Sequence, residues 1–386
     1  MNQTVPLVDF APIARLALLV IVIAQLPLAW VWLRQRGTDS AYRLAALTTL
    51  TLFLTFDLIA FGSFTRLTDS GLGCPDWPGC YGEASPLGAQ AHIDKAQTAM
   101  PSGPVTFTKA WIEMIHRYVA MTVGVLILVM TAFAWRERLK KRGTLPFSPW
   151  WPTLTLVWVI VQGLFGKYTV TLKLYPAVVT LHLLGGLVLL VMLAIQHEAF
   201  SRRPLALATP LRRAALVAGV LLGLQIALGG WVSTNYAVLA CTGFPTCNGQ
   251  WWPSMDFAEG FVVLRHLGHT GDGDLLSVEA LVGIHMVHRI VAVVVAAVLL
   301  WLAWRLLRAG NSTVARFGLG LGLLVMAQVA SGLSNVVLGW PIVAALAHSA
   351  GAAALVLLLA LLLARTRPTG ADAGDADATP GLRAPR

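Results

Sequence analysis

Charged residues are scarce in this sequence. Lys, Arg, Asp and Glu make up 12% of its 386 residues, whereas 57% are hydrophobic. A soluble domain usually carries roughly 25% charged residues, so this composition excludes an ordinary water-soluble protein. The formal net charge is +10, but the basic residues stand in short clusters between apolar runs and form no continuous phosphate-binding face. We therefore expect membrane lipid, and no nucleic acid, among the partners of the chain.

Nine apolar runs are long enough, or nearly so, to cross a bilayer, which takes about 20 residues of helix. Backbone polar groups in lipid must be satisfied within the segment, and a helix does this. The runs lie near residues 12–33, 44–64, 111–135, 150–170, 176–197, 214–235, 280–304, 317–338 and 342–364. The first run lacks a basic leading segment and a small-residue cleavage site, which favours a retained span over a signal peptide. The sequence predicts an all-α polytopic membrane protein.

Basic residues fall on one side of the membrane if the nine spans are threaded in order. By the positive-inside rule this side is the cytoplasm, which places the N-terminus in the periplasm and the C-terminus in the cytoplasm of a bacterial inner membrane. The clusters are Arg34, Arg36 and Arg43; Arg136, Arg138, Lys140, Lys141 and Arg142; Arg202, Arg203, Arg212 and Arg213; Arg305, Arg308 and Arg316; and Arg365, Arg367, Arg383 and Arg386. The end of the chain, 367–386, is predicted to be a disordered cytoplasmic tail.

The chain repeats itself. GSFTRLTDSGLGCPDWPGCYG at 62–82 resembles GGWVSTNYAVLACTGFPTCNG at 229–249, and both contain a C-x5-C motif. EMIHRYVAMTVGVLIL at 113–128 resembles HMVHRIVAVVVAAVLL at 285–300. Matching Cys, His and Arg at equivalent places is much harder to obtain by chance than matching apolar composition. Spans two to five are therefore repeated as spans six to nine.

A third pair of segments extends the repeat, running from Gln162 to His182 and from Gln328 to His348. Each unit has an even number of spans, so both run in the same direction, which predicts a pseudo-twofold axis along the membrane normal. The expected architecture is two pseudo-symmetric four-helix bundles plus one extra N-terminal helix. Its parts are 1–43 (first helix and cytoplasmic loop), 44–200 (first bundle), 201–366 (second bundle) and 367–386 (tail).

Four histidines lie at one predicted depth, about 10 Å below the outer hydrocarbon boundary. They are His116, His182, His288 and His348. An ionisable side chain inside the membrane points to function, and two histidines on different helices of one bundle can take both axial positions of a haem iron. The repeat pairs His116 with His182 and His288 with His348. Zinc would need its ligands in one cluster, and the C-x-x-C-H motif of covalently attached haem is absent from the sequence.

The two halves differ three positions before the first histidine of each pair. In the alignment of the repeat, Glu113 of the first half corresponds to His285 of the second. Residues three apart share a helix face, so we expect Glu113 to point toward the cavity of His116. There it could accept a proton or stabilise positive charge on a substrate carbon. His285 could be a spare ligand or a packing residue. The asymmetry predicts that the first half performs chemistry, while the second holds a permanent haem that passes electrons.

Two arginines directly follow a histidine of each pair, Arg117 in the first half and Arg289 in the second. Near the outer surface, they could pair with haem propionates. Alternatively, their long side chains extend to the membrane–water interface and keep the charged guanidinium group in water.

Taken together, GSFTRLTDSGLGCPDWPGCYG, EMIHR, HMVHR and the later paired histidines resemble the haem A synthase family over residues 44–364. The resemblance implies eight core helices in two pseudo-symmetric bundles. It also implies oxidation of the C8 methyl group of haem O to a formyl group, which gives haem A for cytochrome oxidase. A haem B is expected in the C-terminal half and the substrate in the N-terminal half. Partnership with the farnesyltransferase that makes haem O, or with cytochrome oxidase assembly factors, is implied by the family alone.

Carried over by position, the resemblance implies a role for each intramembrane residue. Glu113 corresponds to the essential carboxylate of the family. His116 and His182 correspond to the ligands of the substrate iron, and His288 and His348 to the ligands of the haem B iron.

The four cysteines resemble the outer-loop cysteines of the family. Loops outside a bacterial cytoplasm face an oxidising compartment, where disulfides persist. The short spacing favours pairs within each loop, Cys74 with Cys80 and Cys241 with Cys247, while cross-pairing and free thiols stay open. Each closed loop is predicted to form a rigid lid over a haem edge.

Two other functions are compatible with parts of this pattern. A two-haem electron-transfer protein of the cytochrome b type, without substrate chemistry, explains all four histidines but not Glu113. A transporter built of parallel repeats explains the repeat, but it predicts broken spans at the midplane and no haem.

Overall fold

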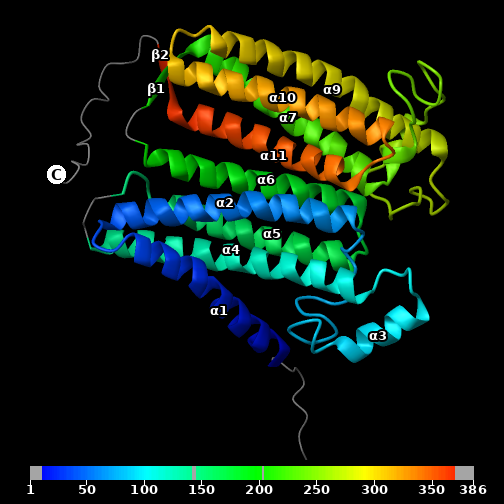
Figure 1. Cartoon of the computed structure of the whole chain (residues 1–386), viewed down its shortest axis with the longest axis horizontal. Helices are drawn as coiled ribbons and strands as arrows, with labels where there is room; N and C mark the ends of the chain where they lie inside the picture. Colours follow the sequence, from blue (N-terminus) through cyan, green and yellow to red (C-terminus); the bar gives the residue numbers. More distant parts are fainter. Residues whose placement is uncertain (1–10, 141–144, 202–203, 370–386) are drawn as a thin grey trace, which may run out of the picture.

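The computed structural model describes residues 11–140, 145–201 and 204–369 (Figure 1). Nine helices in this part of the chain are long and apolar enough to cross a membrane. They are α1 (Ala11–Arg34), α2 (Ser40–Leu67), α4 (Phe107–Leu139), α5 (Trp150–Thr171), α6 (Pro176–Ala199), α7 (Thr209–Thr234), α9 (Val278–Leu307), α10 (Ser312–Val337) and α11 (Ile342–Arg365). Each predicted apolar run overlaps one of these helices, which confirms a multi-pass helical membrane protein.

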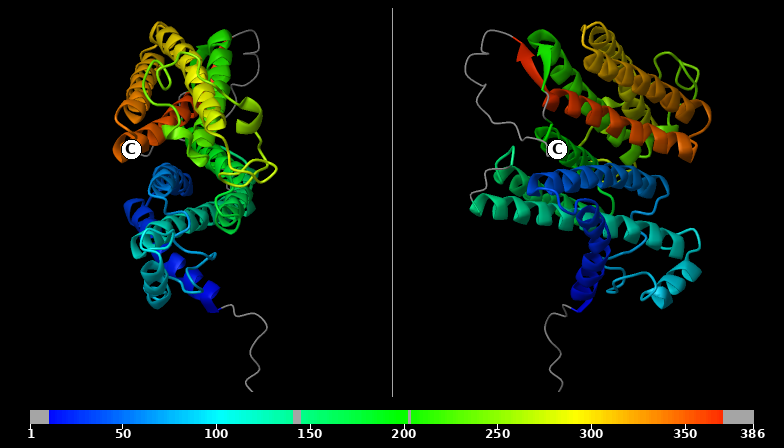
Figure 2. Two further views of the ribbon diagram at one scale, coloured as in Figure 1. Left: turned by 90° about the vertical axis from the view of Figure 1, so that its right-hand side faces the viewer. Right: turned by 60° about the vertical axis from the view of Figure 1, so that its left-hand side comes forward.

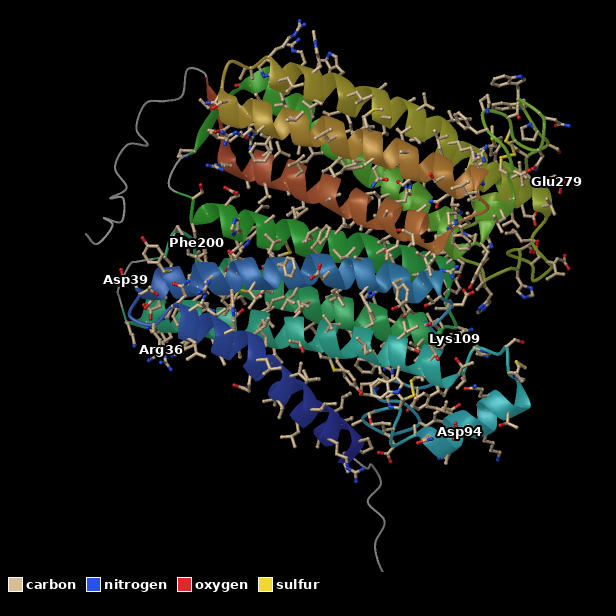
Figure 3. The ribbon with its side chains drawn as sticks, in the orientation of Figure 1. Arg36, Asp39, Asp94, Lys109, Phe200 and Glu279 are labelled. Carbon is tan, nitrogen blue, oxygen red and sulfur yellow. A yellow bond between two sulfur atoms is a disulfide. The ribbon has the colours of Figure 1, made fainter. Side chains whose placement is uncertain are left out.

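Two long connections lie at the same end of the long helices, at the right of Figure 1. One joins α2 to α4 and contains α3 (Gln90–Ala99); the other joins α7 to α9 and contains η1 (Ala237–Leu239) and α8 (Phe257–Gly260). Figure 3 places Asp94, Lys109 and Glu279 at this end and Arg36 and Phe200 at the opposite end. The two C-x5-C motifs are therefore on the face of the protein opposite to Arg36.

Helices α4 and α9 begin before the predicted apolar runs, because polar side chains cap them. Thr106 accepts a hydrogen bond from the main-chain N–H of Lys109, and Ser277 accepts one from that of Ala280. Such caps satisfy main-chain donors that have no partner within the first turn. The caps lengthen each helix at the end that bears the long connections, so His116 and His288 lie further from the helix start than predicted from hydropathy.

The spans pack in two rings that share contacts. Helices α2, α4, α5 and α6 contact one another in ring order, and so do α7, α9, α10 and α11. Helix α6 also contacts α7 and α11, and α2 contacts α11, so the two rings lie side by side (Figure 2). The extra helix α1 packs on α4 and α2. One apolar core runs through both rings, and its buried side chains include Leu126, Ile127, Leu190, Leu302 and Leu306.

A two-stranded parallel sheet was not predicted. Strand β1 (Leu205–Ala208) precedes α7, and β2 (Thr366–Thr369) follows α11, with Leu205 paired with Thr366. The expectation of an all-α chain is right for the spans but misses this pair, which forms because α7 begins and α11 ends close together. The predicted tail therefore starts with a strand, and its remainder, 370–386, lies outside the described residues, as do Lys141, Arg142, Arg202 and Arg203.

Candidate functional site

The first histidine pair lies between α4 and α6. His116 and His182 are close enough for their charges to interact. The His116 ring lies parallel to that of Phe61 from α2, with ring centroids 6.3 Å apart and an interplanar angle of 12°. Three helices of the first ring thus contribute to the surroundings of this pair.

The second pair lies between α9 and α11. His288 and His348 are also close enough for their charges to interact. Both rings make hydrogen bonds, because Gln225 of α7 contacts His288 and Ser331 of α10 contacts His348. The structure thus places one predicted pair in each ring of helices, and the pairing of these histidines on one iron stays a prediction.

A glycine on a neighbouring helix lies against each imidazole. A Cβ atom on Gly62 would be 3.0 Å from Nε2 of His116, and one on Gly229 would be 3.0 Å from Cε1 of His288. The corresponding distances are 3.1 Å from Gly332 to Cε1 of His348, and 3.6 Å from Gly166 to Cε1 of His182. Even a methyl group would crowd three of these rings, so the glycines let the rings lie against the helix backbone.

These glycines were not predicted from the sequence. The signal that could have found them is the repeat itself. Gly62 and Gly229 each open one of the aligned C-x5-C segments, and Gly166 and Gly332 each stand four positions after the aligned Gln162 and Gln328.

The donor set of each pair suits the two axial positions of a haem iron. Each pair offers two imidazoles from different helices, and each imidazole lies against a glycine of a neighbouring helix. Among the described residues, no group of three or more His, Cys, Asp or Glu side chains could hold a metal ion. The arrangement thus fits paired imidazole ligation in each ring of helices.

Glu113 is held by the first C-x5-C loop and by the following turn of its own helix. It is 4% exposed, and its Oε2 accepts a hydrogen bond of 2.8 Å from the main-chain N–H of Cys74. Its Oε1 accepts a hydrogen bond from Arg117, which also forms an ion pair with it. The sequence predicted that this carboxylate faces the cavity of His116; the partners of its two oxygens are instead Cys74 and Arg117.

Arg117 ties the carboxylate to the C-x5-C loop. Its Nη1 donates to the main-chain carbonyls of Asp76 at 2.8 Å, Pro78 at 3.3 Å and Gly79 at 2.5 Å. The guanidinium group is thus surrounded by acceptors from this chain. A propionate contact for Arg117 stays a prediction.

The second half repeats this arrangement around Arg289. Its guanidinium donates to the main-chain carbonyls of Cys241 at 2.7 Å, Gly243 at 3.0 Å and Thr246 at 3.3 Å. Its Nε donates to Nε2 of His285 over 3.3 Å. His285 therefore occupies the place that Glu113 holds in the first half, with a neutral acceptor in place of a carboxylate.

Both C-x5-C loops are closed by disulfides. Cys74 is bonded to Cys80 and Cys241 to Cys247, and all four residues are at most 1% exposed. The pairing favoured by the short spacing is the one the structure has. In the first loop, Asp76 also accepts hydrogen bonds from the main-chain N–H groups of Tyr81 and Gly82. The loops are therefore rigid frames that present carbonyl groups to the two arginines.

A polar cluster at the C-terminal ends of α2 and α7 joins the two rings and was not predicted. Arg66 donates to the Ser233 carbonyl at 2.6 Å, and its guanidinium carbon lies 4.0 Å from the ring centroid of Tyr236. The Tyr236 hydroxyl donates to Asp69 over 2.8 Å. Burial is the main cause that raises the pKa of Tyr236 above its ordinary value, with Asp69 adding to the rise and Arg66 opposing it.

These features define a class of protein: a multi-pass helical membrane protein that has two histidines within each of two rings of helices and a disulfide-closed loop at the same end of each ring. The chain belongs to the COX15-CtaA family of cytochrome oxidase assembly proteins, whose model matches residues 45–360.

Curated relatives agree with this family. The chain is 40% identical over 316 residues to the "Heme A synthase" of Shewanella oneidensis, a match that covers 80% of this chain and 92% of that protein. It is 29% identical over 305 residues to the "Heme A synthase" of Shouchella clausii, covering 76% and 86% of the two chains. It is 30% identical over 340 residues to that of Methylobacterium nodulans, covering 81% and 88%.

Proposed function

We propose that this chain is a haem A synthase, which oxidises the C8 methyl group of haem O to a formyl group and so supplies haem A for cytochrome oxidase. The observation that carries the proposal is the 40% identity to the Shewanella oneidensis "Heme A synthase", over 92% of that protein. Substrate delivery by the farnesyltransferase that makes haem O, and contact with cytochrome oxidase assembly factors, are part of the same proposal.

The two histidine pairs have different roles in this proposal. His116 and His182 hold the iron of the substrate, haem O. His288 and His348 hold a resident haem B, which when bound would carry one electron at a time. Both Nδ1 atoms of the second pair have a hydrogen-bonding side chain beside them, which suits a site that keeps its ligand.

Glu113 acts in the first half as a fixed negative charge. Arg117 and the N–H of Cys74 hold its two oxygens, so the carboxylate has little freedom to reorient. A pre-oriented carboxylate can stabilise positive charge that develops on the methyl carbon during its successive oxidations. His285 offers no such charge in the second half, which supports chemistry in the first half alone.

We further propose that the two bundles, 44–200 and 201–366, are related by a pseudo-twofold axis. The contacts of Arg66 with Ser233 and of Asp69 with Tyr236 both join residues 167 positions apart. This is also the offset between Cys74 and Cys241 in the repeat. Equivalent positions of two repeats touch each other only near an axis that relates them, so the polar cluster supports an axis between α2 and α7.

The proposed setting is the bacterial inner membrane, with the disulfide loops and the N-terminus in the periplasm and the C-terminus in the cytoplasm. Arg36 lies at the end of the helices opposite to Asp94 and Glu279 (Figure 3). A basic connection on one face and disulfides on the other suit a cytoplasmic and an oxidising side, respectively.

Pigment extraction from cells that express wild-type or Glu113→Ala protein tests the activity. We expect haem A from the wild type, and haem O or a partly oxidised intermediate from Glu113→Ala. Haem A from the variant would show that Glu113 is dispensable. If the wild type also failed to raise the haem A level of the host, a two-haem electron carrier would be favoured instead. Protein that purifies without haem absorbance would contradict the proposal as a whole.

A further inference from the structure

The four imidazoles differ in the side chains that contact their Nδ1 atoms. Ser331 Oγ lies 3.1 Å from Nδ1 of His348 and itself donates to the main-chain carbonyl of Gln328 at 3.2 Å. Because the hydroxyl proton is used toward Gln328, the oxygen is free to accept the N–H of the ring. This leaves Nε2 of His348 unprotonated, as an iron ligand must be.

Gln225 makes the corresponding contact in the other half of this pair. Its Nε2 lies 3.0 Å from Nδ1 and 3.4 Å from Nε2 of His288, and it donates to the His288 main-chain carbonyl at 3.1 Å. Its Oε1 is buried without a hydrogen-bond partner. A half-turn of the amide would place this oxygen against a protonated Nδ1, and it would exchange the bond to the His288 carbonyl for one to the ring.

The first pair has no such support. Nδ1 of His182 is buried with no hydrogen-bond partner. Across the described ranges, no hydrogen bond reaches the ring of His116, which stacks against the aromatic ring of Phe61. The rings of the first pair are therefore held by packing alone.

The repeat explains the difference at the level of single residues. Ser331 directly precedes Gly332, and the residue that precedes the equivalent Gly166 is Phe165. Gln225 stands four positions before Gly229, and the residue four positions before the equivalent Gly62 is Leu58. Both hydrogen-bonding positions of the second half are thus apolar in the first half.

We propose that Ser331 and Gln225 are positioning residues that make the His288–His348 site retentive for its haem, whereas Phe165 and Leu58 leave the His116–His182 site exchangeable. This inference rests on the proposed function, in which one haem stays and the other enters as substrate and leaves as product. A partner that bonds the second nitrogen fixes the tautomer and orientation of a ligating histidine, and its loss typically costs about 10- to 100-fold in metal affinity. An enzyme that must release a macrocyclic product cannot use the tighter arrangement in both bundles.

Haem dissociation from the purified full-length protein tests the inference. Transfer of haem to excess apomyoglobin gives the rate, and the low-spin ferric EPR signal reports the orientation of the axial ligands. We expect Ser331→Ala and Gln225→Leu to release the resident haem about 10- to 100-fold faster than the wild type and to shift its EPR signal. Ser331→Thr keeps the hydroxyl and is expected to restore the slow rate.

Ser334→Ala is the matched control, because the Ser334 hydroxyl bonds the Ala330 carbonyl one turn away on the same helix and touches no histidine. It should release haem at the wild-type rate. Wild-type rates and spectra for both Ser331→Ala and Gln225→Leu would overturn the inference.

The reciprocal variants test the exchangeable site. Leu58→Gln is expected to slow the release of haem O from the first bundle, and Phe165→Ser to slow it further if the chain folds, as judged by retention of the resident haem. Haem O release from Leu58→Gln at the wild-type rate would contradict the inference. If His348→Ala keeps the slowly released haem, the proposed haem B site is itself wrong. If His348→Ala loses this haem but Ser331→Ala releases it at the wild-type rate, only the positioning role is contradicted.

Discussion

The Tyr236 hydroxyl donates a hydrogen bond of 2.8 Å to Asp69, a residue 167 positions earlier in the chain. Asp69 also forms an ion pair with Arg66 at 3.1 Å, and Arg66 lies over the Tyr236 ring. Arg66 and Ser233 each stand one helical turn beyond a glycine, Gly62 or Gly229, that lies against a histidine. The cluster thus links α2, whose Gly62 lies against His116, to α7, whose Gly229 lies against His288.

Substitutions in this cluster should loosen the contact between the two rings of helices. Tyr236→Phe removes one hydrogen bond but keeps the ring beside Arg66, so we expect a loss of about 0.5–1.5 kcal/mol in stability. Arg66→Ala also removes the ion pair and the bond to the Ser233 carbonyl, and should cost more. Thermal unfolding in detergent measures both, with Tyr168→Phe, at an exposed tyrosine on α5, as the control. An Arg66→Ala protein no less stable than Tyr168→Phe would show that the cluster does not hold the rings together.

The same tyrosine gives a prediction for pH. Burial, aided by Asp69 and opposed by Arg66, raises the pKa of Tyr236 above its ordinary value of 10.0. A raised pKa means that folding favours the protonated phenol, so its stabilising contribution is fully present below pH 10 and is lost as pH rises through the higher folded pKa. The difference in stability between the wild type and Tyr236→Phe should stay constant from pH 7 to about 10 and shrink above that. Tyrosinate absorbance that appears below pH 10 in the wild type, but not in the variant, would contradict this order.

Arg117 should be more costly to remove than an exposed arginine, because its loss leaves the Glu113 carboxylate buried and unpaired. Breaking a buried ion pair by removing one partner costs about 3–5 kcal/mol. Arg117→Ala should therefore be strongly destabilised, and adding Glu113→Ala should recover part of the loss. A double-mutant cycle by thermal unfolding measures this coupling. Additive effects of the two substitutions would mean that the pair contributes nothing as a unit.

The first disulfide should matter because it frames the carbonyls that Arg117 contacts. Replacing Cys74 and Cys80 together by Ser frees the loop, so we expect lower haem O turnover with the resident haem kept. The matched pair, Cys241 and Cys247 replaced by Ser, should instead weaken retention of the resident haem. Extracted pigments and the bound haem per chain report the two effects. Unchanged spectra and activity in both variants would refute a role for the loops at the sites.

The sequence was sufficient for the features that depend on local pattern. Apolar runs of span length predict the nine membrane helices because lipid leaves the backbone no other partner, and the repeat predicts which histidines meet. The sequence was insufficient where the conformation of a loop brings together groups that are far apart in the chain. The partners of Glu113 are an example, since helix periodicity predicts the face of a side chain but not the main-chain N–H of Cys74 that lies against it. The β1–β2 pair and the contact of Tyr236 with Asp69 depend in the same way on segments far apart in sequence.

The glycines that lie against the histidine rings give the most selective test of the two sites. A Cβ on Gly62 would lie 3.0 Å from Nε2 of His116, closer than ordinary contact, and this nitrogen is the one expected to bind iron. Gly62→Ala should therefore impair binding of haem O in the first bundle while the resident haem remains. Gly332→Ala, with its Cβ 3.1 Å from the His348 ring, should do the reverse.

Gly124→Ala is the control for this pair, because a Cβ on Gly124 would meet nothing within 4 Å. Alanine stabilises helices relative to glycine by about 0.8–1.0 kcal/mol, so the control separates a gain in helix stability from crowding at the ring. Haem per chain, measured as the pyridine haemochrome before and after addition of haem O, should fall for one site only in each test variant. Equal loss from both sites would mean that the alanine disturbs the whole fold. No loss from either site would mean that the rings move away from these glycines when haem binds.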